Sequence, residues 1–503
     1  MTNKKKTAPQ PCTDAGNAEW IAALFGDALR YDHKQSRWLI WSKRRRWIED
    51  KANEVRKFAI AAARRRLRAA ARLADTNKSK AEIKWAFASE DRYRVDAALD
   101  IAKSLPPISD LGDGWDADPW LFGVANGIVD LRTGKLCPAT QQDRITKFSP
   151  VVFDPNATCP RFEQFVREIF GGDVVLICYV QKAAGYSLTG SVQEQCIFIL
   201  YGPGANGKTT LVEILLYVMG DYGDDLPISV LEAKRNGSAP GEAVKLPGLR
   251  FAKSVEIREG RRLDEARVKA LTGGDTISVR PLYHNAFSFR PTHKLWLAVN
   301  HKPVITDNSP AMWRRIRLIP FLCTFEGQQA DKRLLEKLKA EAPGILNWMI
   351  QGCMAWQKEG LEPPPPVQEA TREYQEDSDP LSAFVKDRCE AGDGFEVGRG
   401  ELYDAYRKWC EDNDQEPLKI GDFKSRMSQR FVPDRSGHGG KKVWKGLRLP
   451  DVAGDGVGCP TVSGDSHSSP IEPATEKVSE NLDTARHQDT VDSPSLAELA
   501  LEP

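Results

Sequence analysis

The feature that most constrains the fold of this 503-residue chain is a glycine-rich stretch at residues 202–209. It reads GPGANGKT and fits the pattern G-x-x-x-x-G-K-[ST] without substitution. The apolar run 196–201 before it predicts a buried strand, and helical spacing after it predicts an amphipathic helix, with apolar residues Leu211, Ile214, Leu215 and Val218. Glycines in such a loop let successive backbone N–H groups point at bound phosphate. We therefore expect an α/β domain with a phosphate loop, the name used below for residues 202–209.

The phosphate loop predicts ATP and Mg²⁺ as cofactors. Lys208 brings positive charge to the β and γ phosphates, and the Thr209 hydroxyl can ligate Mg²⁺. The expected nucleotide-binding residues are Gly202, Pro203, Gly204, Ala205, Asn206, Gly207, Lys208, Thr209 and Thr210. A chance glycine loop is the competing interpretation, and the agreement of motif and context disfavours it.

Two further predicted strands end on polar residues. Residues 250–256 end on Glu256, with Glu259 close behind, and residues 294–299 are followed by Asn300. A P-loop ATPase needs an acidic residue on a neighbouring strand to hold Mg²⁺ and orient the attacking water. We expect Glu256 to serve as this catalytic and metal-binding residue, although such a strand end by itself would indicate a solvated edge. The Asn300 amide could contact the γ-phosphate or the attacking water.

A hairpin and an arginine pair follow in the same region. Residues 276–280 and 286–290 alternate in polarity around the turn 281–285, which predicts a hairpin with an aromatic and an imidazole at its tip. Arg314 and Arg315 lie in the run WRRIR before another strand-like segment. Their guanidinium groups could complete the phosphate site of a neighbouring subunit, or they could form structural ion pairs.

Composition limits the class of protein. The chain has 41% hydrophobic residues, enough for two to four domains, and its ten cysteines form neither a C-x-x-C pair nor a cluster with histidines. This pattern indicates reduced thiols and argues against structural zinc. The sequence contains neither an apolar run near the length of a membrane span nor a signal-peptide core, so we expect a cytoplasmic protein without membrane contact.

Charge is unevenly distributed although the net charge is only +1. Residues 43–84 contain fifteen Lys or Arg against five Asp or Glu, whereas residues 451–503 contain eleven acidic residues against two basic ones. One end of the chain could hold nucleic acid and the other would repel it. The alanine- and arginine-rich helix expected at residues 52–74 could equally present a solvated face.

The predicted organisation has six parts. Asn126-Gly127, between two apolar runs, predicts a hairpin in the second part, and residues 331–358 predict a helix in the third. The parts are a disordered segment 1–13, a mixed α+β domain 14–150, the ATPase domain 151–360, a Pro-rich linker 361–379, a compact domain 380–450 and an acidic disordered tail 451–503.

Residues 380–450 predict three helices followed by a glycine-tipped hairpin, as in a winged helix. The expected third helix and the hairpin are basic, with Lys424, Arg426, Arg430, Lys441, Lys442 and Lys445. Such a domain could bind duplex origin DNA, and a protein-docking module of the same shape is the alternative.

Taken in order, these motifs resemble those of superfamily 3 helicases. The order is G-x-x-x-x-G-K-T, a strand ending in Glu, K-x-L-T-G-G-D-x-I-x-x-R, a strand ending in Asn, and W-R-R-I. The likeness is to the helicase half of phage and plasmid primase-helicases and of the poxvirus primase-helicase, over residues 14–325 and on toward 449. It implies an AAA+-like α/β core in a homohexameric ring with single-stranded DNA in its pore.

The resemblance also implies roles for individual residues. Asn300 would be the polar sensor, and Arg314 or Arg315 the finger that acts across the subunit boundary. The hairpin would point into the pore, with Arg280, Tyr283 and His284 as DNA contacts. Glu256 and Glu259 are separated by two residues, so the division of labour between them stays open, and His284 stands where related helicases often show a lysine nearby.

We therefore expect a replicative DNA helicase of a phage, prophage or plasmid-like element, moving 3′ to 5′ in a bacterial host. Clustered carboxylates and a zinc site are not recognisable before Trp115, so we expect the primase to be a separate protein. Two alternatives remain: an ATP-dependent origin-binding or loader protein, and a DNA-stimulated ATPase without unwinding activity.

Overall fold

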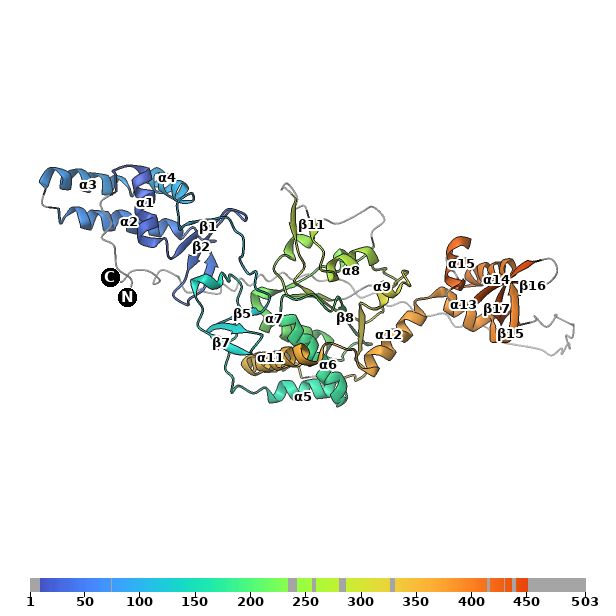
Figure 1. Cartoon of the computed structure of the whole chain (residues 1–503). Coiled ribbons are helices and arrows are strands. Elements are labelled where there is room, and N and C mark those ends of the chain that lie inside the picture. Colours follow the sequence, from blue (N-terminus) through green and yellow to red (C-terminus); the bar gives the residue numbers. More distant parts are fainter. Residues whose placement is uncertain are drawn as a thin grey trace, which may run out of the picture. The chain divides into compact units, whose positions relative to one another are not determined.

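The structure is a computed structural model that divides the chain into two compact units, Met1–Asp379 and Pro380–Pro503 (Figure 1). It describes residues 10–73, 75–233, 242–255, 259–279, 286–325, 331–413, 417–428, 430–436 and 440–450. The predicted acidic tail and most of the predicted N-terminal segment lie outside these ranges.

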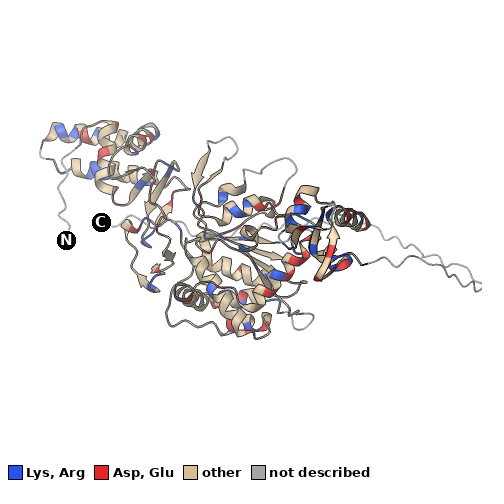
Figure 2. Cartoon of the chain, turned by 45° about the vertical axis from the view of Figure 1, so that its right-hand side comes forward, with Lys and Arg blue, Asp and Glu red and all other residues tan. Residues whose placement is uncertain are grey.

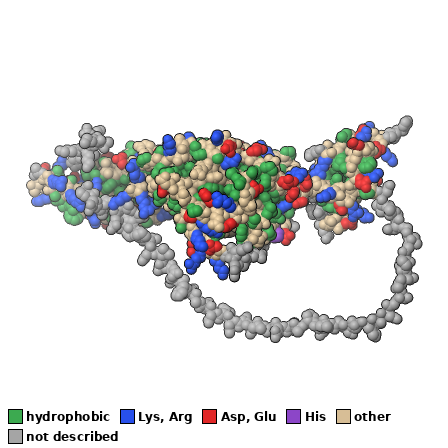
Figure 3. Space-filling view, turned by 90° about the horizontal axis from the view of Figure 1, so that it is seen from below, with side chains coloured by type: hydrophobic (Ala, Val, Ile, Leu, Met, Phe, Trp, Pro, Cys, Tyr) green, Lys and Arg blue, Asp and Glu red, His purple; other side chains and the backbone are tan. Residues whose placement is uncertain are grey.

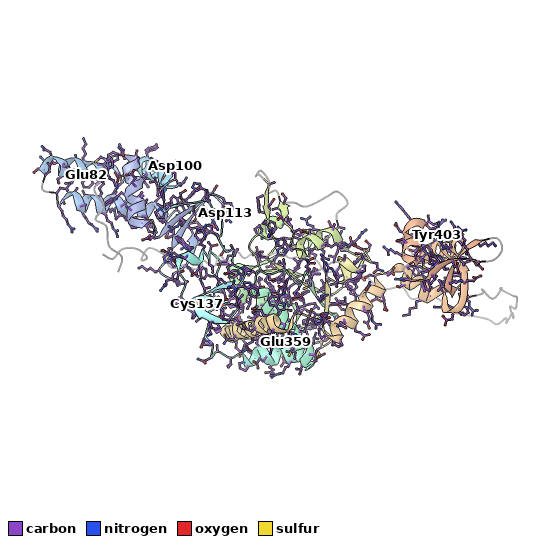
Figure 4. The ribbon with its side chains drawn as sticks, viewed as in Figure 1. Glu82, Asp100, Asp113, Cys137, Glu359 and Tyr403 are labelled. Carbon is purple, nitrogen blue, oxygen red and sulfur yellow. The ribbon has the colours of Figure 1, made fainter. Side chains whose placement is uncertain are left out.

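The first unit begins with four helices and a small sheet of order β3-β2-β1-β4. Its helices are α1 (Asp14–Phe25), α2 (Val55–Ala70), α3 (Thr76–Ala88) and α4 (Arg92–Ala102), and its strands are β1 (Leu29–Asp32), β2 (Arg37–Trp41), β3 (Trp47–Glu49) and β4 (Ser109–Asp110). Arg66 of α2 is buried and reaches Glu82 of α3, with Nε to Oε2 at 2.7 Å, and Asn17 of α1. This contact fixes three helices to one another; Figure 4 labels Glu82.

A second small sheet, of order β5-β6-β7, precedes the phosphate loop in the chain. Its strands are β5 (Leu121–Val124), β6 (Gly127–Asp130) and β7 (Lys135–Cys137), followed by the 3-10 helix η1 (Gln141–Asp143). The predicted hairpin is present, but its turn is Ala125-Asn126, because Gly127 already pairs with Val124. Gly127 answers a tertiary need instead: an added Cβ would lie 2.7 Å from the carbonyl oxygen of Cys137 on β7.

A five-stranded parallel sheet of order β14-β8-β13-β10-β9 forms the centre of the first unit (Figure 1). Alternate side chains of β8 face opposite layers: Phe198 and Leu200 pack in the core with α5, α6, α7 and α11 (Ala342–Glu359), whereas Ile197 and Ile199 pack with α8. The elements are α5 (Pro160–Ile169), α6 (Val174–Leu188), β8 (Ile197–Tyr201), α7 (Lys208–Met219), β9 (Gly223–Asp225), β10 (Phe251–Val255), α8 (Glu265–Thr272), β13 (Lys294–Val299), α9 (Pro310–Trp313) and β14 (Ile316–Pro320). Burial on both faces explains why these strands read as continuous apolar runs.

The predicted hairpin after α8 is also present. Strands β11 (Ile277–Val279) and β12 (Phe287–Phe289) pair antiparallel, and the turn between them lies outside the described residues. Short 3-10 helices complete this part of the chain: η2 (Gly220–Tyr222), η3 (Ile228–Val230) and η4 (Glu242–Lys245).

The single helix predicted over residues 331–358 is divided into α10 (Leu334–Ala340) and α11 (Ala342–Glu359). Glu341 at the break accepts hydrogen bonds from the backbone N–H groups of Arg161 and Phe162, at 3.1 and 2.9 Å. Pro343 lies in the first turn of α11, where its missing N–H is not needed. A contact with the distant helix α5 thus ends the first helix.

The Pro-rich linker predicted at residues 361–379 is wrong for most of its length. Helix α12 (Pro365–Asp377) occupies it and packs on β14. Tyr374 is 1% exposed, donates a hydrogen bond to the Pro303 carbonyl oxygen and lies edge-on to Trp313. Prolines are tolerated at the first turn of a helix, so the proline run precedes and starts α12 rather than forming an extended spacer.

The second unit contains three helices and an antiparallel sheet of order β15-β17-β16. Its elements are α13 (Pro380–Arg388), β15 (Glu390–Gly398), α14 (Arg399–Asp412), α15 (Ile420–Ser428), β16 (Val432–Ser436) and β17 (Lys441–Arg448). Leu402, Tyr406, Phe423 and Trp444 are buried in its core. The three predicted helices and the hairpin are present, and β15 is an additional strand that its glycine-rich sequence did not indicate.

Among the described residues, we find no helix of sufficient length and apolarity to span a membrane.

Candidate functional site

The phosphate loop lies at the carboxyl end of β8, between β14 and β13 of the parallel sheet. A cavity of about 240 Å³ opens there. It is lined by the loop, by the first turn of α7 and by the ends of β10 and β13, with Gly204, Ala205, Asn206, Gly207, Lys208, Thr209, Thr210, Val255, Ala298 and Asn300. The carboxyl edge of a parallel sheet is the usual location of a ligand site in α/β proteins. Predicted residues separated by ninety positions therefore meet at one cavity.

The backbone of the loop favours glycine at three positions, of which Gly204 has φ 121°. Gly207 has φ 82°, and an added Cβ would lie 2.5 Å from Cγ2 of Ile169 on α5. Gly202 is confined by the end of β14, since its Cβ would lie 2.4 Å from the carbonyl oxygen of Phe321. Helix α5 and the segment after β14 thus hold the loop in a compact shape around its inward N–H groups.

Lys208 is buried within the loop, at 4% exposure. Its Nζ donates to the carbonyl oxygen of Gly202 and to Oδ1 of Asn206, each at 2.8 Å. Both acceptors are neutral, and burial lowers the pKa of the Lys208 ammonium to about 8. The loop therefore concentrates an incompletely compensated positive charge where phosphate would lie.

The other predicted site residues fall into three groups: those that line the cavity, those that lie elsewhere among the described residues, and those outside the described residues. Thr209 and Asn300 line the cavity and are exposed, and Val255, directly before Glu256, also lines it. Glu256 itself lies outside the described residues. The Glu259 side chain is 83% exposed and lies 4.0 Å from Nδ1 of His301.

Arg314 and Arg315 lie at the start of β14, at the sheet edge opposite their own phosphate loop. A five-residue strand spans about 16 Å, so neither side chain is near the cavity at the far end. Arg314 is exposed, with Nη2 donating to Oε1 of Gln195 at 3.0 Å. Arg315 is 8% exposed and donates to Oγ1 of Thr272 and to the Ala311 carbonyl oxygen; burial and the neighbouring Arg314 lower its pKa.

Sequence reasoning missed the network that joins α8 to the segment after Asn300. Glu265 accepts hydrogen bonds from the backbone N–H and the hydroxyl of Thr306, at 2.9 and 2.8 Å, and Lys269 pairs with Asp307. Burial acts to raise the pKa of Glu265, but the Thr306 hydrogen bonds hold it below its ordinary value. Helix α8 precedes the β11–β12 hairpin in the chain, so this network joins that helix to the segment after β13. The spacing of isolated polar residues gave no signal for it.

Arg280, Tyr283 and His284, the predicted DNA contacts of the hairpin, lie outside the described residues. In the second unit, Lys424 on α15 and Lys441 and Lys442 at the start of β17 are exposed, whereas Lys445 pairs with Asp434 at 2.5 Å. Arg426 and Arg430 also have partners. The described residues include no group of three or more His, Cys, Asp or Glu able to hold a metal ion by themselves.

Three protein-family models match the chain. D5 N terminal like matches residues 18–171, poxvirus D5 protein-like matches residues 376–445, and a family of unknown function matches residues 200–315. The three matched ranges lie in the N-terminal region, the sheet with the phosphate loop and the C-terminal unit.

Relatives come from large DNA viruses. A protein named "Putative helicase" from Acanthamoeba polyphaga mimivirus is 29% identical over 323 residues, which cover 59% of this chain and 34% of the relative. Another "Putative helicase", from Frog virus 3, is 25% identical over 60% of this chain and 40% of its own length. A "Putative primase" of African swine fever virus is 23% identical over 59% and 34%. This chain thus spans about a third to two-fifths of the length of these relatives.

Among solved structures, the A form of the apo NrS-1 C terminal region is similar over 84% of this chain and 98% of its own, with a TM-score of 0.48 and 9% identity. The family models and the viral relatives confirm the family resemblance that the sequence motifs predict. By these matches the chain resembles the D5-type primase-helicases, as its motifs predict.

Proposed function

We propose that this protein is an ATP- and Mg²⁺-dependent DNA helicase of superfamily 3 that unwinds DNA during replication. The observation that carries the proposal is the cavity at the carboxyl edge of the sheet, where Lys208, Thr209 and Asn300 converge. A complete phosphate loop, a hydroxyl at its helix start and an amide on the neighbouring strand end are the parts that a P-loop ATPase uses. The viral relatives named as helicases support the same function.

The residues of the cavity fit nucleotide and metal. The loop is open to solvent through Thr209, whose hydroxyl has no hydrogen-bond partner among the described residues and is free to ligate Mg²⁺. Lys208 would neutralise the β and γ phosphates, and Glu256, directly after the cavity-lining Val255, would share the metal site. Bound Mg²⁺ would neutralise charge on the phosphates. The residues of this chain would hold the nucleotide in position.

The same proposal includes an AAA+-like core and assembly into a homohexameric ring. Arg314 is the better finger, because it is exposed at the opposite sheet edge, where only another subunit's cavity could meet it. Arg315 is committed to Thr272 and Ala311. The hairpin with Arg280, Tyr283 and His284 would face single-stranded DNA in the pore, with movement 3′ to 5′.

The second unit supports a contact with duplex DNA. Its element order, α13-β15-α14-α15-β16-β17, is compatible with a winged helix, and Lys424, Lys441 and Lys442 are exposed on the third helix and the hairpin. We propose that it binds origin duplex while the first unit acts on single strands.

Unwinding of a forked duplex tests the proposal. The wild-type chain should hydrolyse ATP and separate the fork, and Lys208→Ala should lower both by at least about a hundredfold, because it removes charge stabilisation in the transition state. Lys302→Ala is a matched control near the same edge, since Lys302 pairs with Asp377 and does not line the cavity. Footprinting on duplex without unwinding would favour an origin-binding loader, and hydrolysis without either would favour a DNA-stimulated ATPase.

A further inference from the structure

The basic segment at residues 43–84 is divided by the structure into neutralised and unneutralised parts. On α2, Arg56 pairs with Asp96, Arg64 with Glu90 and Arg66 with Glu82, while Arg65 lies over the Phe25 ring. Figure 2 shows the resulting alternation of basic and acidic segments on the N-terminal helices. On the face seen in Figure 3, basic and acidic side chains are likewise intermixed, so charge alone does not single out a nucleic-acid surface.

The turn between β2 and β3 differs from α2. Arg44 is exposed and has no ion pair or side-chain hydrogen bond with any residue that the structure describes. Arg45 has φ 55°, a left-handed conformation that costs an arginine about 1 kcal/mol. Its Nε donates to the Ala139 carbonyl oxygen at 3.1 Å, which holds the side chain and leaves its two Nη groups without a partner among the described residues. The turn thus presents two cationic groups, of which Arg45 is held in place.

A cleft of about 610 Å³ lies beside this turn. Arg44 and Arg45 form one side, the β5–β6 turn the other, and Leu136 and Pro138 supply an apolar surface; the remaining lining residues are Ala125, Asn126, Gly127 and Ala139. The lining contains no acidic residue. Asn126 is occupied, because its amide bonds to both the N–H and the carbonyl oxygen of Phe153 at 2.9 Å. The cleft therefore suits a ligand with an anionic part, which would meet Arg44 and Arg45, and an apolar part, which would meet Leu136 and Pro138.

The walls of the cleft are held in place from both sheets. Trp47 of β3 donates from Nε1 to the Gln141 carbonyl oxygen at 3.1 Å, and the Arg46 guanidinium lies over the Phe148 ring. Ile128, Ile145 and Phe148 form a shared core against Trp41. The two turns consequently keep their separation without a ligand, which lowers the ordering cost of binding.

We propose that this cleft binds a single-stranded nucleic acid, with phosphates on Arg44 and Arg45 and a base or sugar against Leu136 and Pro138. Single strands expose apolar base faces beside their phosphates, whereas a duplex presents a convex surface of solvated phosphates that does not enter a cavity of this size. The inference extends the proposed function. Only the choice of DNA as the nucleic acid rests on that proposed function. It gives the N-terminal region a strand contact separate from the pore hairpin.

A thiol at a lining position reports on the cleft. Leu136 lines the cleft, whereas its neighbour Cys137, exposed on β7 (Figure 4), does not, so the probe is Leu136→Cys in a Cys137→Ser background, and Cys178 on α6 is an exposed reference. Maleimide alkylation of the full chain should slow several-fold at position 136, and not at Cys178, when an oligo-dT of about twenty nucleotides is added. Equal rates at position 136 with and without oligonucleotide would overturn the proposal. Equal protection by duplex, by dTMP or by poly-glutamate of matched charge would also overturn it.

Substitution tests the cationic side. Arg44→Ala/Arg45→Ala should weaken oligo-dT affinity about tenfold and reduce the slope of log K against log salt by about 1.4, as expected for two lost phosphate contacts on a single strand. Arg68→Ala/Arg72→Ala is the matched control, because both side chains are exposed and lack partners among the described residues of the same region. Equal losses in the two variants would show a net-charge effect and reject the cleft.

Arg44→Ala alone leaves the Arg45 bond to Ala139 intact, so it separates ligand contact from folding of the turn. It should give about half of the slope change. An unchanged slope in this variant, with unchanged circular dichroism, would reject the assignment. Because Lys208→Ala removes hydrolysis but not the cleft, protection at position 136 should persist when Lys208→Ala is added to the probe variant, and failure of the ATPase proposal is distinguishable from failure of this one.

Discussion

At the residue scale, the site depends on a lysine whose described hydrogen-bond acceptors are neutral oxygens. Burial lowers the pKa of Lys208 from 10.5 to about 8. The unfolded chain then binds more protons than the folded chain between these values, so the free energy of unfolding gains a contribution that rises with pH through that window. Phosphate beside the ammonium would favour the charged form and reverse the shift.

Nucleotide binding should therefore take up protons near pH 8.5. We expect calorimetric binding enthalpies in two buffers of different ionisation enthalpy to differ there, and the apparent affinity to fall as pH rises above about 8. Lys208→Arg is the matched control, because a guanidinium stays protonated throughout this range. Identical enthalpies in both buffers for the wild type would contradict a buried, partly deprotonated lysine.

At the scale of elements, buried polar contacts decide how helices of the N-terminal region assemble. Arg66 and Glu82 are 5% and 7% exposed, and their pair joins α2 to α3. The hydrogen bond from Arg66 lowers the pKa of the Glu82 carboxyl, although burial opposes it. A depressed acid pKa stabilises the fold above the unfolded value, and this stabilisation is lost as pH falls through the folded pKa.

Arg66→Ala should destabilise the helical part by about 3–5 kcal/mol, because it leaves the Glu82 carboxylate buried without its partner. Hydrogen exchange of the α2 and α3 amides would measure the loss locally, as the chain has more than one folding unit. Arg66→Met/Glu82→Leu should recover most of the stability. The difference between wild type and Arg66→Ala should shrink at acid pH; a constant difference would mean that packing, not charge, is lost.

At the scale of the whole molecule, the separation of Arg314 from its own phosphate loop predicts that Arg314 acts on the nucleotide of a neighbouring subunit. The two groups lie at opposite edges of the sheet, so one chain cannot bring them together at one nucleotide. A head-to-tail ring places unlike surfaces in contact and would supply the missing arginine from the next subunit.

Mixing two inactive proteins tests this. Lys208→Ala subunits and Arg314→Ala subunits, combined in equal amounts, should regain hydrolysis, because about a quarter of the interfaces in random rings join an intact loop to an intact arginine. Each parent should be lowered about a thousandfold. Light scattering must show that mixed rings form. Normal assembly without recovery at any ratio would mean that Arg314 serves its own chain or only the fold.

The sequence by itself determined the parts of the site that are local. The strand, phosphate loop and helix from residue 196 to 219 and the β5–β6 and β11–β12 hairpins were predictable from sequence. Each of these elements depends on periodicity and turn residues within a short contiguous stretch of the chain. The candidate residues Lys208, Thr209 and Asn300 followed from these patterns, since parallel strand ends share one edge of a sheet.

Only the tertiary structure decided matters that depend on contacts between distant residues. Proline content suggested a linker over residues 361–379, but burial of Tyr374 against Pro303 and Trp313 makes α12, which occupies most of that range, part of the first unit. Arg314 and Arg315 look equivalent in sequence, and only Thr272 and Ala311 distinguish the buried one. By sequence alone the arginines of α2 could form a nucleic-acid surface or a solvated face, and the structure pairs Arg56, Arg64 and Arg66 with acidic residues outside α2. Charge is written in the sequence, whereas its compensation is set by which side chains folding brings together.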